Sequence, residues 1–208
     1  MQNTVATRSP AHDFTLGGLR TAQLGMLVLW SLGCLGLTHW GDGRWQYDRS
    51  AVLVGEWWRL LSAHWMHLNL LHALGNVVGG WVLLLIFAPV LSVQRVALVW
   101  LWSTIGVSLG LWFLYPDIQW YVGASGALHG LWAAGALLMW SRDKVFAMLA
   151  LLAVTVKCWW EWQSGHSVGH WYLEGATVVT EAHRCGLVAG IAIALPLMWL
   201  DRKLRQDA

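Results

Sequence analysis

The chain has 208 residues, of which 57% are hydrophobic and only 12% are charged. Ordinary soluble domains carry roughly 25% charged residues, so the composition excludes a water-soluble globular domain of this length. The formal net charge of +2 is too small to indicate a nucleic-acid-binding protein. We therefore predict a polytopic membrane protein with no nucleic-acid partner.

Long uncharged stretches give the predicted spans. Segments without Asp, Glu, Lys or Arg cover residues 21–41, 60–94, 96–116, 118–141, 145–156 and 185–200. A spanning helix needs about 20 mostly apolar residues, and the first four segments reach that length unaided. We predict an all-α membrane protein, a six-helix bundle, with helices at 18–39, 65–87, 93–115, 124–141, 144–163 and 177–200.

The ends of the chain are predicted to lie in the cytoplasm. Residues 1–17 are expected to form an N-terminal tail and residues 201–208 a C-terminal tail around one domain, 18–200. The first helix follows a polar leader without a small-residue cleavage site, so it is expected to be a retained span. The inside segments would carry eight basic residues against three outside, which agrees with the positive-inside rule.

Polar side chains in the second predicted helix need an explanation, because they are costly in a bilayer and usually functional. His72 and Asn76 are four residues apart and share one helix face. His67 lies five residues earlier, about 140° away on a regular helix, so it is not expected to neighbour His72. The pair could bind a developing negative charge or could link two helices by hydrogen bonds. The residues alone leave both readings open.

The stretch "WYVGASGALHGLWAAG", residues 120 to 135, contains Gly-x-Ser-Gly within a predicted span. The motif alone is weak, because small residues such as Gly126 and Gly130 often serve helix packing. At a helix N-terminus, however, Ser125 would lie among free backbone N–H groups that can stabilise an oxyanion. The serine becomes nucleophilic only if a base takes its proton.

His183 is the candidate base. The fourth and sixth predicted helices run in the same direction, so their N-terminal ends should meet at the same level. Glycines four residues apart occur on both helices, Gly126 with Gly130 and Gly186 with Gly190, and small residues let backbones approach closely. We therefore predict that Ser125 and His183 lie within hydrogen-bonding range.

Two acidic residues lie near these positions. Lys157 and Glu161 are four residues apart and are expected to form an ion pair within the fifth helix. Glu181 precedes His183 by two residues, which on a helix directs its side chain about 160° away. The cysteines (Cys34, Cys158 and Cys185) have no metal or disulfide spacing and are expected to be small buried side chains.

The ordered set of these motifs resembles the rhomboid intramembrane serine proteases over about residues 56 to 195. The set comprises Trp58-Arg59, His67, His72, Asn76, Gly123-x-Ser125-Gly126 and His183-x-x-Gly186-x-x-x-Gly190. Each element is weak alone, but the ordered set is specific. The segments "GASGALHG" and "EGATVVTEAH" are similar to the rhombosortase branch, bacterial rhomboids associated with proteins that bear a C-terminal Gly-Gly sorting tail.

The resemblance implies a catalytic Ser125–His183 dyad without a third acid. It implies an oxyanion hole formed by His72, Asn76 and the backbone N–H of Ser125, while His67 would organise the first outer loop. Many rhomboids carry a tyrosine four residues after the serine, and this chain departs from that pattern with His129. This residue is expected to stack on His183 or to form a hydrogen bond within the site. The residues implied to shape the site are Gly123, Gly126, His129, Gly186, Gly190 and His67.

The resemblance also implies where the protein works and on what. The expected substrates are membrane proteins with a tail of Gly-Gly, an apolar helix and basic residues, and membrane lipid is the surrounding partner. No cofactor and no metal are expected. The expected location is the bacterial inner membrane, with the active site open to the periplasm.

Three other readings are weighed against this one. A catalytically inactive rhomboid relative would bind client helices without cutting, although such relatives typically lack the serine or the histidine. A metal or haem protein is suggested by His64, His67 and His72, but His-Glu-x-x-His is absent from the sequence. A small transporter would be favoured by inverted repeats, and the sequence shows none.

Overall fold

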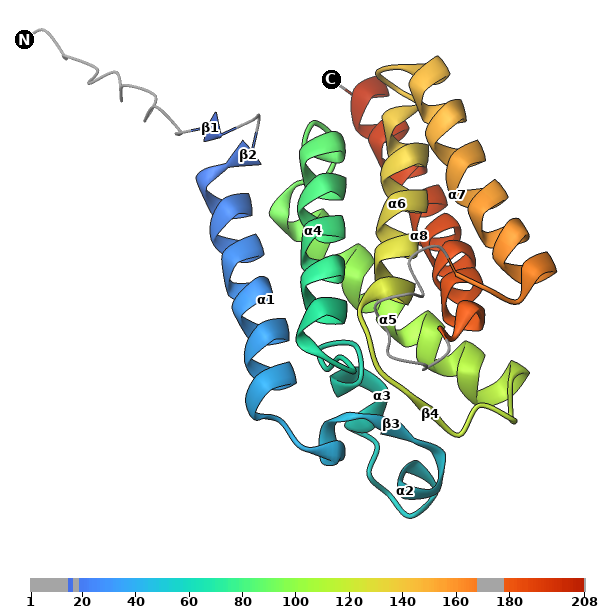
Figure 1. Ribbon diagram of the computed structural model, residues 1–208. Coiled ribbons are helices and arrows are strands. Elements are labelled where there is room, and N and C mark those ends of the chain that lie inside the picture. Colours follow the sequence, from blue (N-terminus) through green and yellow to red (C-terminus); the bar gives the residue numbers. More distant parts are fainter. Residues whose placement is uncertain (1–14, 17–18, 168–177, 208) are drawn as a thin grey trace, which may run out of the picture.

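The computed structural model describes residues 15–16, 19–167 and 178–207. Within them five helices are long and apolar enough to cross a membrane: α1 (Thr21–Trp40), α4 (Leu70–Phe87), α5 (Val93–Leu114), α7 (Lys144–Ser164) and α8 (Thr180–Gln206). A sixth apolar helix, α6 (Ser125–Met139), has only 15 residues. These helices lie side by side in one bundle (Figure 1), and the predicted all-α membrane fold class is confirmed.

The smaller elements lie mainly in residues 41–69, the first connection. It contains η1 (Gly43–Trp45), β3 (Tyr47–Asp48), α2 (Arg49–Leu53) and α3 (Arg59–Ser62). Strand β3 pairs antiparallel with β4 (Trp120–Tyr121), which leads into α6. A second antiparallel pair joins β1 (Thr15–Leu16) to β2 (Leu19–Arg20) before α1. The β3–β4 pair therefore fixes the first connection to the segment that precedes Ser125, and we call this end of the bundle the site end.

The start of α4 differs from the predicted helix at 65–87. The helix begins at Leu70, and the side chain of Asn69 caps it by accepting a hydrogen bond from the backbone N–H of His72, at 2.8 Å. Residues 63–69 form turns and irregular structure. The carbonyl of Ala63 accepts a hydrogen bond from the N–H of Gly123 at 2.9 Å. His67 therefore precedes the helix instead of lying on it.

Other bounds shift less. The helix expected at 18–39 is α1, 93–115 is α5, 124–141 is α6 and 144–163 is α7, each within three residues at either end. The last helix, expected to end at 200, continues to Gln206. Residues 1–14, 17 and 177, which belong to the expected N-terminal tail and to the expected start of the last helix, lie outside the described residues.

Helix α6 is the centre of the bundle. It packs against α4, α5, α7 and α8, and 12 of its 15 residues are buried. Its approach to α8 depends on glycine, because a Cβ added to Gly186 would overlap the carbonyl of Gly126 and one added to Gly190 would overlap that of Gly130. In lipid, where no hydrophobic force pulls helices together, such backbone contact is a main source of association. The close approach expected from the two glycine strips is thus present.

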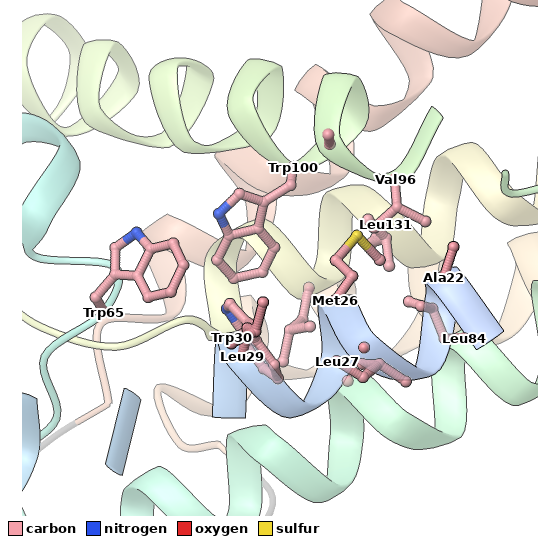
Figure 2. Close-up of a pocket in the computed structure, with 14 residues that line it drawn as sticks. Ala22, Met26, Leu27, Leu29, Trp30, Trp65, Leu84, Val96, Trp100 and Leu131 are labelled. Carbon is pink, nitrogen blue, oxygen red and sulfur yellow. The ribbon is translucent and has the colours of Figure 1, made fainter. Parts of the chain in front are cut away.

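Helix α1 is packed differently, through aromatic side chains. An apolar cavity of about 650 Å³ lies between α1 and helices α4, α5 and α6 (Figure 2). The ring of Trp30 meets that of Trp100 edge to face, with centroids 5.3 Å apart. Gly80 leaves room for Trp30, since an added Cβ would lie 2.6 Å from its ring. The contact between α1 and the rest of the bundle is therefore looser than that between α6 and α8.

The replacement Gly186→Ala is expected to destabilise the fold strongly, because its methyl group meets the rigid backbone of α6. Overpacking of this kind typically lowers the free energy of unfolding by about 1–3 kcal/mol. Because the backbone of α6 cannot move aside, we expect a loss at the upper end of this range. The free energy of unfolding in detergent measures the effect. Gly25→Ala is the matched control, since nothing lies within 4 Å of that position on α1. Equal effects of the two replacements would contradict the assigned role of Gly186.

Candidate active site

Ser125 is the first residue of α6, directly after a sharp turn. Gly123 adopts φ +123°, a left-handed conformation that favours glycine. A Cβ at this position would also lie 3.0 Å from the ring of His72. The hydroxyl of Tyr121 donates to the carbonyl of Gly123 at 2.6 Å. The turn holds the serine hydroxyl at the N-terminus of α6, where unpaired helix N–H groups and the positive end of the helix dipole lie.

His183 lies in the first turn of α8 and is buried. Its Nε2 atom is 2.9 Å from the Oγ atom of Ser125. The two residues are 58 positions apart in the sequence, and the contact between Gly126 and Gly186 brings their helices close enough for it to form. The geometry is that of a serine hydroxyl facing a histidine base.

Glu161 on α7 adds a third group to this pair. The predicted ion pair with Lys157 is present at 2.5 Å, but the other carboxylate oxygen, Oε2, lies 2.8 Å from Nδ1 of His183. The carboxylate is fully buried, and Ser167 donates its hydroxyl to Oε1 at 2.6 Å. The arrangement thus differs from the expected dyad without a third acid: Ser125, His183 and Glu161 form one hydrogen-bonded series.

Glu161 was missed as a site residue because its i, i+4 spacing with Lys157 accounts for both charges within one helix. Only the packing of α7 against α8 turns the carboxylate toward His183. The available signal was the presence of a carboxylate within the helix predicted at 144–163, which is itself a reason to expect function. Glu181, the other acidic residue near His183 in sequence, instead pairs with Arg184 at 3.2 Å.

His129 lies one turn after Ser125 and stacks on His183, with ring centroids 4.0 Å apart and planes 13° apart. Its Nδ1 atom donates to the carbonyl of Ser125 at 2.7 Å. The Nε2 atom is buried and has no partner among the described residues. The stacking expected for this position is present, and it restricts the rotation of the His183 ring.

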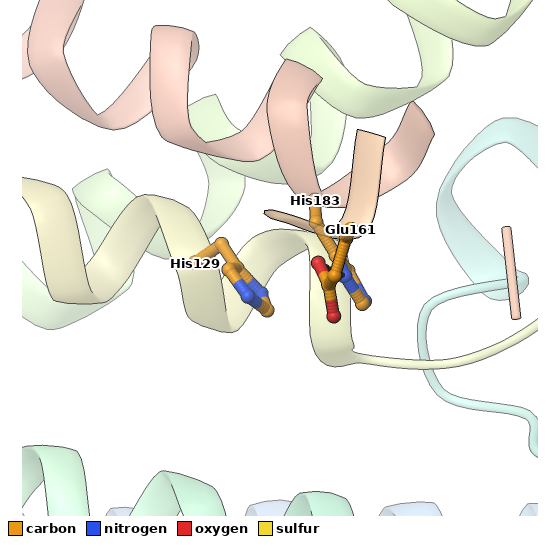
Figure 3. Close-up of side chains that lie close together, drawn as sticks. All are labelled: His129, Glu161 and His183. Atoms are coloured by element: carbon orange, nitrogen blue, oxygen red, sulfur yellow. Dashed lines mark hydrogen bonds and ion pairs between the residues drawn. The ribbon is translucent and has the colours of Figure 1, made fainter. Parts of the chain in front are cut away.

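His129, Glu161 and His183 are also close enough to suggest a metal site (Figure 3). Their candidate ligand atoms lie within 4.8 Å of one another. A metal ion needs lone pairs that converge on one point. Because the two imidazole rings are stacked, their lone pairs lie in two nearly parallel planes and do not converge on one point. The geometry favours a hydrogen-bonded site over a metal centre.

His72 and Asn76 lie on α4 across from Ser125. The backbone N–H of Leu68 donates to Nδ1 of His72 at 3.5 Å, so the neutral ring carries its hydrogen on Nε2, the side that faces Gly123. The side-chain amide of Asn76 donates to the carbonyl of His72 at 3.0 Å. Both residues line a cavity of about 610 Å³ that also contains Ser125 and His183 and is walled by α4, α6 and α7.

His67 contradicts the expectation that it faces away from His72. The two rings meet edge to face with centroids 5.0 Å apart, because residues before Leu70 are not helical. Nε2 of His67 accepts from the backbone N–H of Ala124 at 3.4 Å, and Nδ1 lies 3.3 Å from the hydroxyl of Thr38, which donates to the carbonyl of Cys34. His67 therefore connects α1 to the residue before Ser125.

A separate set of contacts orders the first connection. The guanidinium of Arg59 is buried and donates to the carbonyls of Gly43 and Gln46 at 2.8 and 3.0 Å. It also pairs with Glu56 at 2.5 Å. Both residues of the Trp58-Arg59 motif thus donate to backbone carbonyls of the same connection, since the indole N–H of Trp58 donates to the carbonyl of Arg44 at 3.4 Å.

The fold and the site together define a helical multi-pass membrane protein in which a half-buried serine lies beside a buried histidine and a buried carboxylate at one end of the bundle. Comparison with known families identifies residues 54–200 as a rhomboid domain. This match covers well over half of the chain, so the chain belongs to the rhomboid family.

Similar proteins agree with this assignment. The chain is 30% identical over 142 residues to the protein named "Putative rhomboid protease YdcA" of Bacillus subtilis, covering 62% of this chain and 69% of that protein. It is 36% identical over 114 residues to RHOMBOID-like protein 2 of Arabidopsis thaliana and 34% identical over 116 residues to RHOMBOID-like protein 6, mitochondrial, of the same plant. These matches cover 52% and 51% of this chain but only 34% and 36% of the plant proteins. The family supports an intramembrane protease-like function.

Acid is expected to destabilise the first connection through His67. Burial lowers the pKa of His67 to about 3, against about 6.5 in an unfolded chain. Between these values the unfolded chain binds a proton that the folded chain excludes, so stability falls as the pH falls through this window. The unfolding temperature should therefore drop between pH 7 and pH 4.5, and His67→Gln should reduce that drop.

The control for this experiment is His39→Gln, which replaces an exposed histidine at the end of α1. It should leave the pH dependence of the unfolding temperature as in the unmodified protein. If His67→Gln has the same pH dependence as the unmodified protein, His67 does not carry this effect.

Proposed function

We propose that the protein is an intramembrane serine endopeptidase in which Ser125 is the nucleophile and His183 the general base. The observation that carries the proposal is the 2.9 Å contact between Ser125 Oγ and His183 Nε2 in a cavity walled by membrane-spanning helices. Membership of the rhomboid family and the similarity to a protein named as a rhomboid protease support it.

In the first step Ser125 Oγ attacks the carbonyl carbon of a peptide bond while Nε2 of His183 takes the hydroxyl proton. A carbon–oxygen bond forms, and the carbonyl oxygen becomes an oxyanion. When the tetrahedral intermediate collapses, the carbon–nitrogen bond breaks and His183 returns the proton to the leaving amine. Water then attacks the serine ester in the same manner, which releases the acid product and restores Ser125.

The oxyanion would be held by donors at the N-terminus of α6 and on α4. The backbone N–H of Ser125 belongs to the first turn of α6, whose N–H groups have no intrahelical acceptor. Nε2–H of His72 and the side-chain amide of Asn76 border the same cavity. In a site of low dielectric such donors act strongly on a developing charge, which favours the catalytic over the purely structural reading of these two residues.

The substrate proposed is a membrane protein whose C-terminal tail contains Gly-Gly, an apolar helix and basic residues, as in the rhombosortase branch. Glycine weakens a helix, so a Gly-Gly segment unwinds more readily into the cavity than a regular span does. We place the protein in a bacterial inner membrane with both termini cytoplasmic and the site end toward the periplasm. The excess of basic residues on the proposed cytoplasmic side supports this orientation.

A reporter that ends in Gly-Gly, an apolar helix and a basic cluster tests both the reaction and the substrate. Co-expressed with the intact protein, the reporter should be cut near Gly-Gly, and Ser125→Ala should abolish the cut. The mass of the product after membrane extraction gives the cleavage position and distinguishes hydrolysis from transfer to another nucleophile.

The other results of this experiment count against parts of the proposal. Equal cutting with and without Ser125→Ala would exclude Ser125 as the nucleophile. An uncut reporter would contradict the Gly-Gly tail as substrate. Labelling of Ser125 by a fluorophosphonate would then separate an active protease with another substrate from a client-binding relative that does not cut.

Replacement of the proposed oxyanion donors should slow the chemical step. His72→Ala and Asn76→Ala are each expected to lower kcat by about 100-fold or more, the typical cost of losing one such donor, with a smaller change in KM. Steady-state cleavage of the reporter tail in detergent micelles measures both constants. If the residues only link helices, the unfolding temperature will fall instead and the kcat of the folded fraction will be retained.

A further inference from the structure

We propose that Glu161 is a positioning residue for the base, so that Ser125, His183 and Glu161 work as a triad. This inference rests on the proposed function, since it assigns a role within the same site. Its basis is the second hydrogen bond of the His183 ring: Nδ1 lies 2.8 Å from Oε2 of Glu161 while Nε2 lies 2.9 Å from Ser125 Oγ.

The two contacts of the ring determine which nitrogen carries the hydrogen. A carboxylate only accepts hydrogen bonds, so Nδ1 of His183 must donate to Glu161. In the neutral imidazole Nε2 then has a lone pair directed at the hydroxyl of Ser125. This is the tautomer that a general base requires. Without the carboxylate, the ring would be free to place its hydrogen on Nε2, where it could not accept the serine proton.

The surroundings of Glu161 keep it available as an acceptor. Its oxygens receive hydrogens from Lys157, Ser167 and His183, and all three partners are donors. The side chain is completely buried, so water does not compete for these contacts. A carboxylate that is held by several donors in a dry site is rigid, and its direction is fixed toward the ring.

The same contact matters after the proton has moved. When Nε2 takes the serine proton, the ring becomes an imidazolium, and the carboxylate at Nδ1 stabilises the positive charge without accepting the proton itself. The other groups that face His183 do not stabilise the positive charge of the imidazolium in this way. His129 is stacked on its ring face, Lys157 is cationic, and Glu181 pairs with Arg184.

The competing explanation is that Glu161 serves only as the counterion of Lys157. An ammonium left without a partner in a membrane-spanning helix is costly, so loss of Glu161 would then act through Lys157. The two explanations differ for the double replacement Lys157→Met with Glu161→Gln, which removes both charges. Activity should return in the double variant if Glu161 is only a counterion and should stay low if Glu161 positions His183.

The test measures how fast Ser125 reacts with a fluorophosphonate probe in detergent micelles, a step that forms an oxygen–phosphorus bond and releases fluoride without depending on the natural substrate. Glu161→Gln should slow labelling by at least about 100-fold, because loss of the acid from soluble triads costs about 10⁴-fold. Glu161→Asp should recover part of the rate. Glu181→Gln, the matched control with the same change of charge, should stay within about twofold of the unmodified protein.

A second readout is independent of whether the variants fold. The ¹⁵N shifts of the His183 ring in the unmodified protein should report hydrogen on Nδ1, and an Nε2–H tautomer would overturn the inference. Recovery of labelling in the double variant, or Glu161→Gln labelling at the unmodified rate, would also overturn it. If the unmodified protein labels no faster than Ser125→Ala, it is the proposed function that fails.

Discussion

The direct contact between the backbones of α6 and α8 is the constraint on which the rest of the structure depends. Glycine on both helices removes the side chains that would otherwise separate them, and Gly186 approaches the carbonyl of Gly126 more closely than any larger residue would allow. This single contact sets the distance between Ser125 and His183, which come from helices whose first residues are far apart in the sequence. In lipid, where apolar side chains gain little by leaving their surroundings, such backbone contact defines a unique arrangement.

The polar groups of the site are supported from outside the bundle core. The pairing of β3 with β4, the buried Arg59 and the hydrogen bond from Ala124 to His67 all fix the segment that enters α6. Ser125 therefore sits on a rigid turn, while His183 and Glu161 are held by α8 and α7. Each of the three groups is oriented by a different element, so no single helix determines the geometry of the site.

The sequence predicted the parts of this structure that follow from periodicity and from small residues. The long apolar helices, the glycine strips and the approach of Ser125 to His183 belong to this class. The irregular segment before Leu70 was not predictable from hydropathy, because residues 60–69 are as uncharged as the helix that follows. The contact of Glu161 with His183 was not predictable either, since it depends on the rotation of α7 about its own axis. The spacing of residues along one helix shows which side chains share a face. It does not show which other helix packs against that face.

The shortness of α6 limits how far its two ends can reach across a bilayer. Fifteen residues make a helix of about 22 Å, against a hydrocarbon core of about 30 Å. The helix is thus about 8 Å shorter than the apolar layer, so its two ends cannot both reach the headgroups. A helix end that stops inside the apolar layer is away from the water that would otherwise satisfy its N–H and C=O groups. The protein itself must supply those partners, and under the proposed function the thickness of the bilayer would help to set which peptide bond of a membrane substrate reaches Ser125.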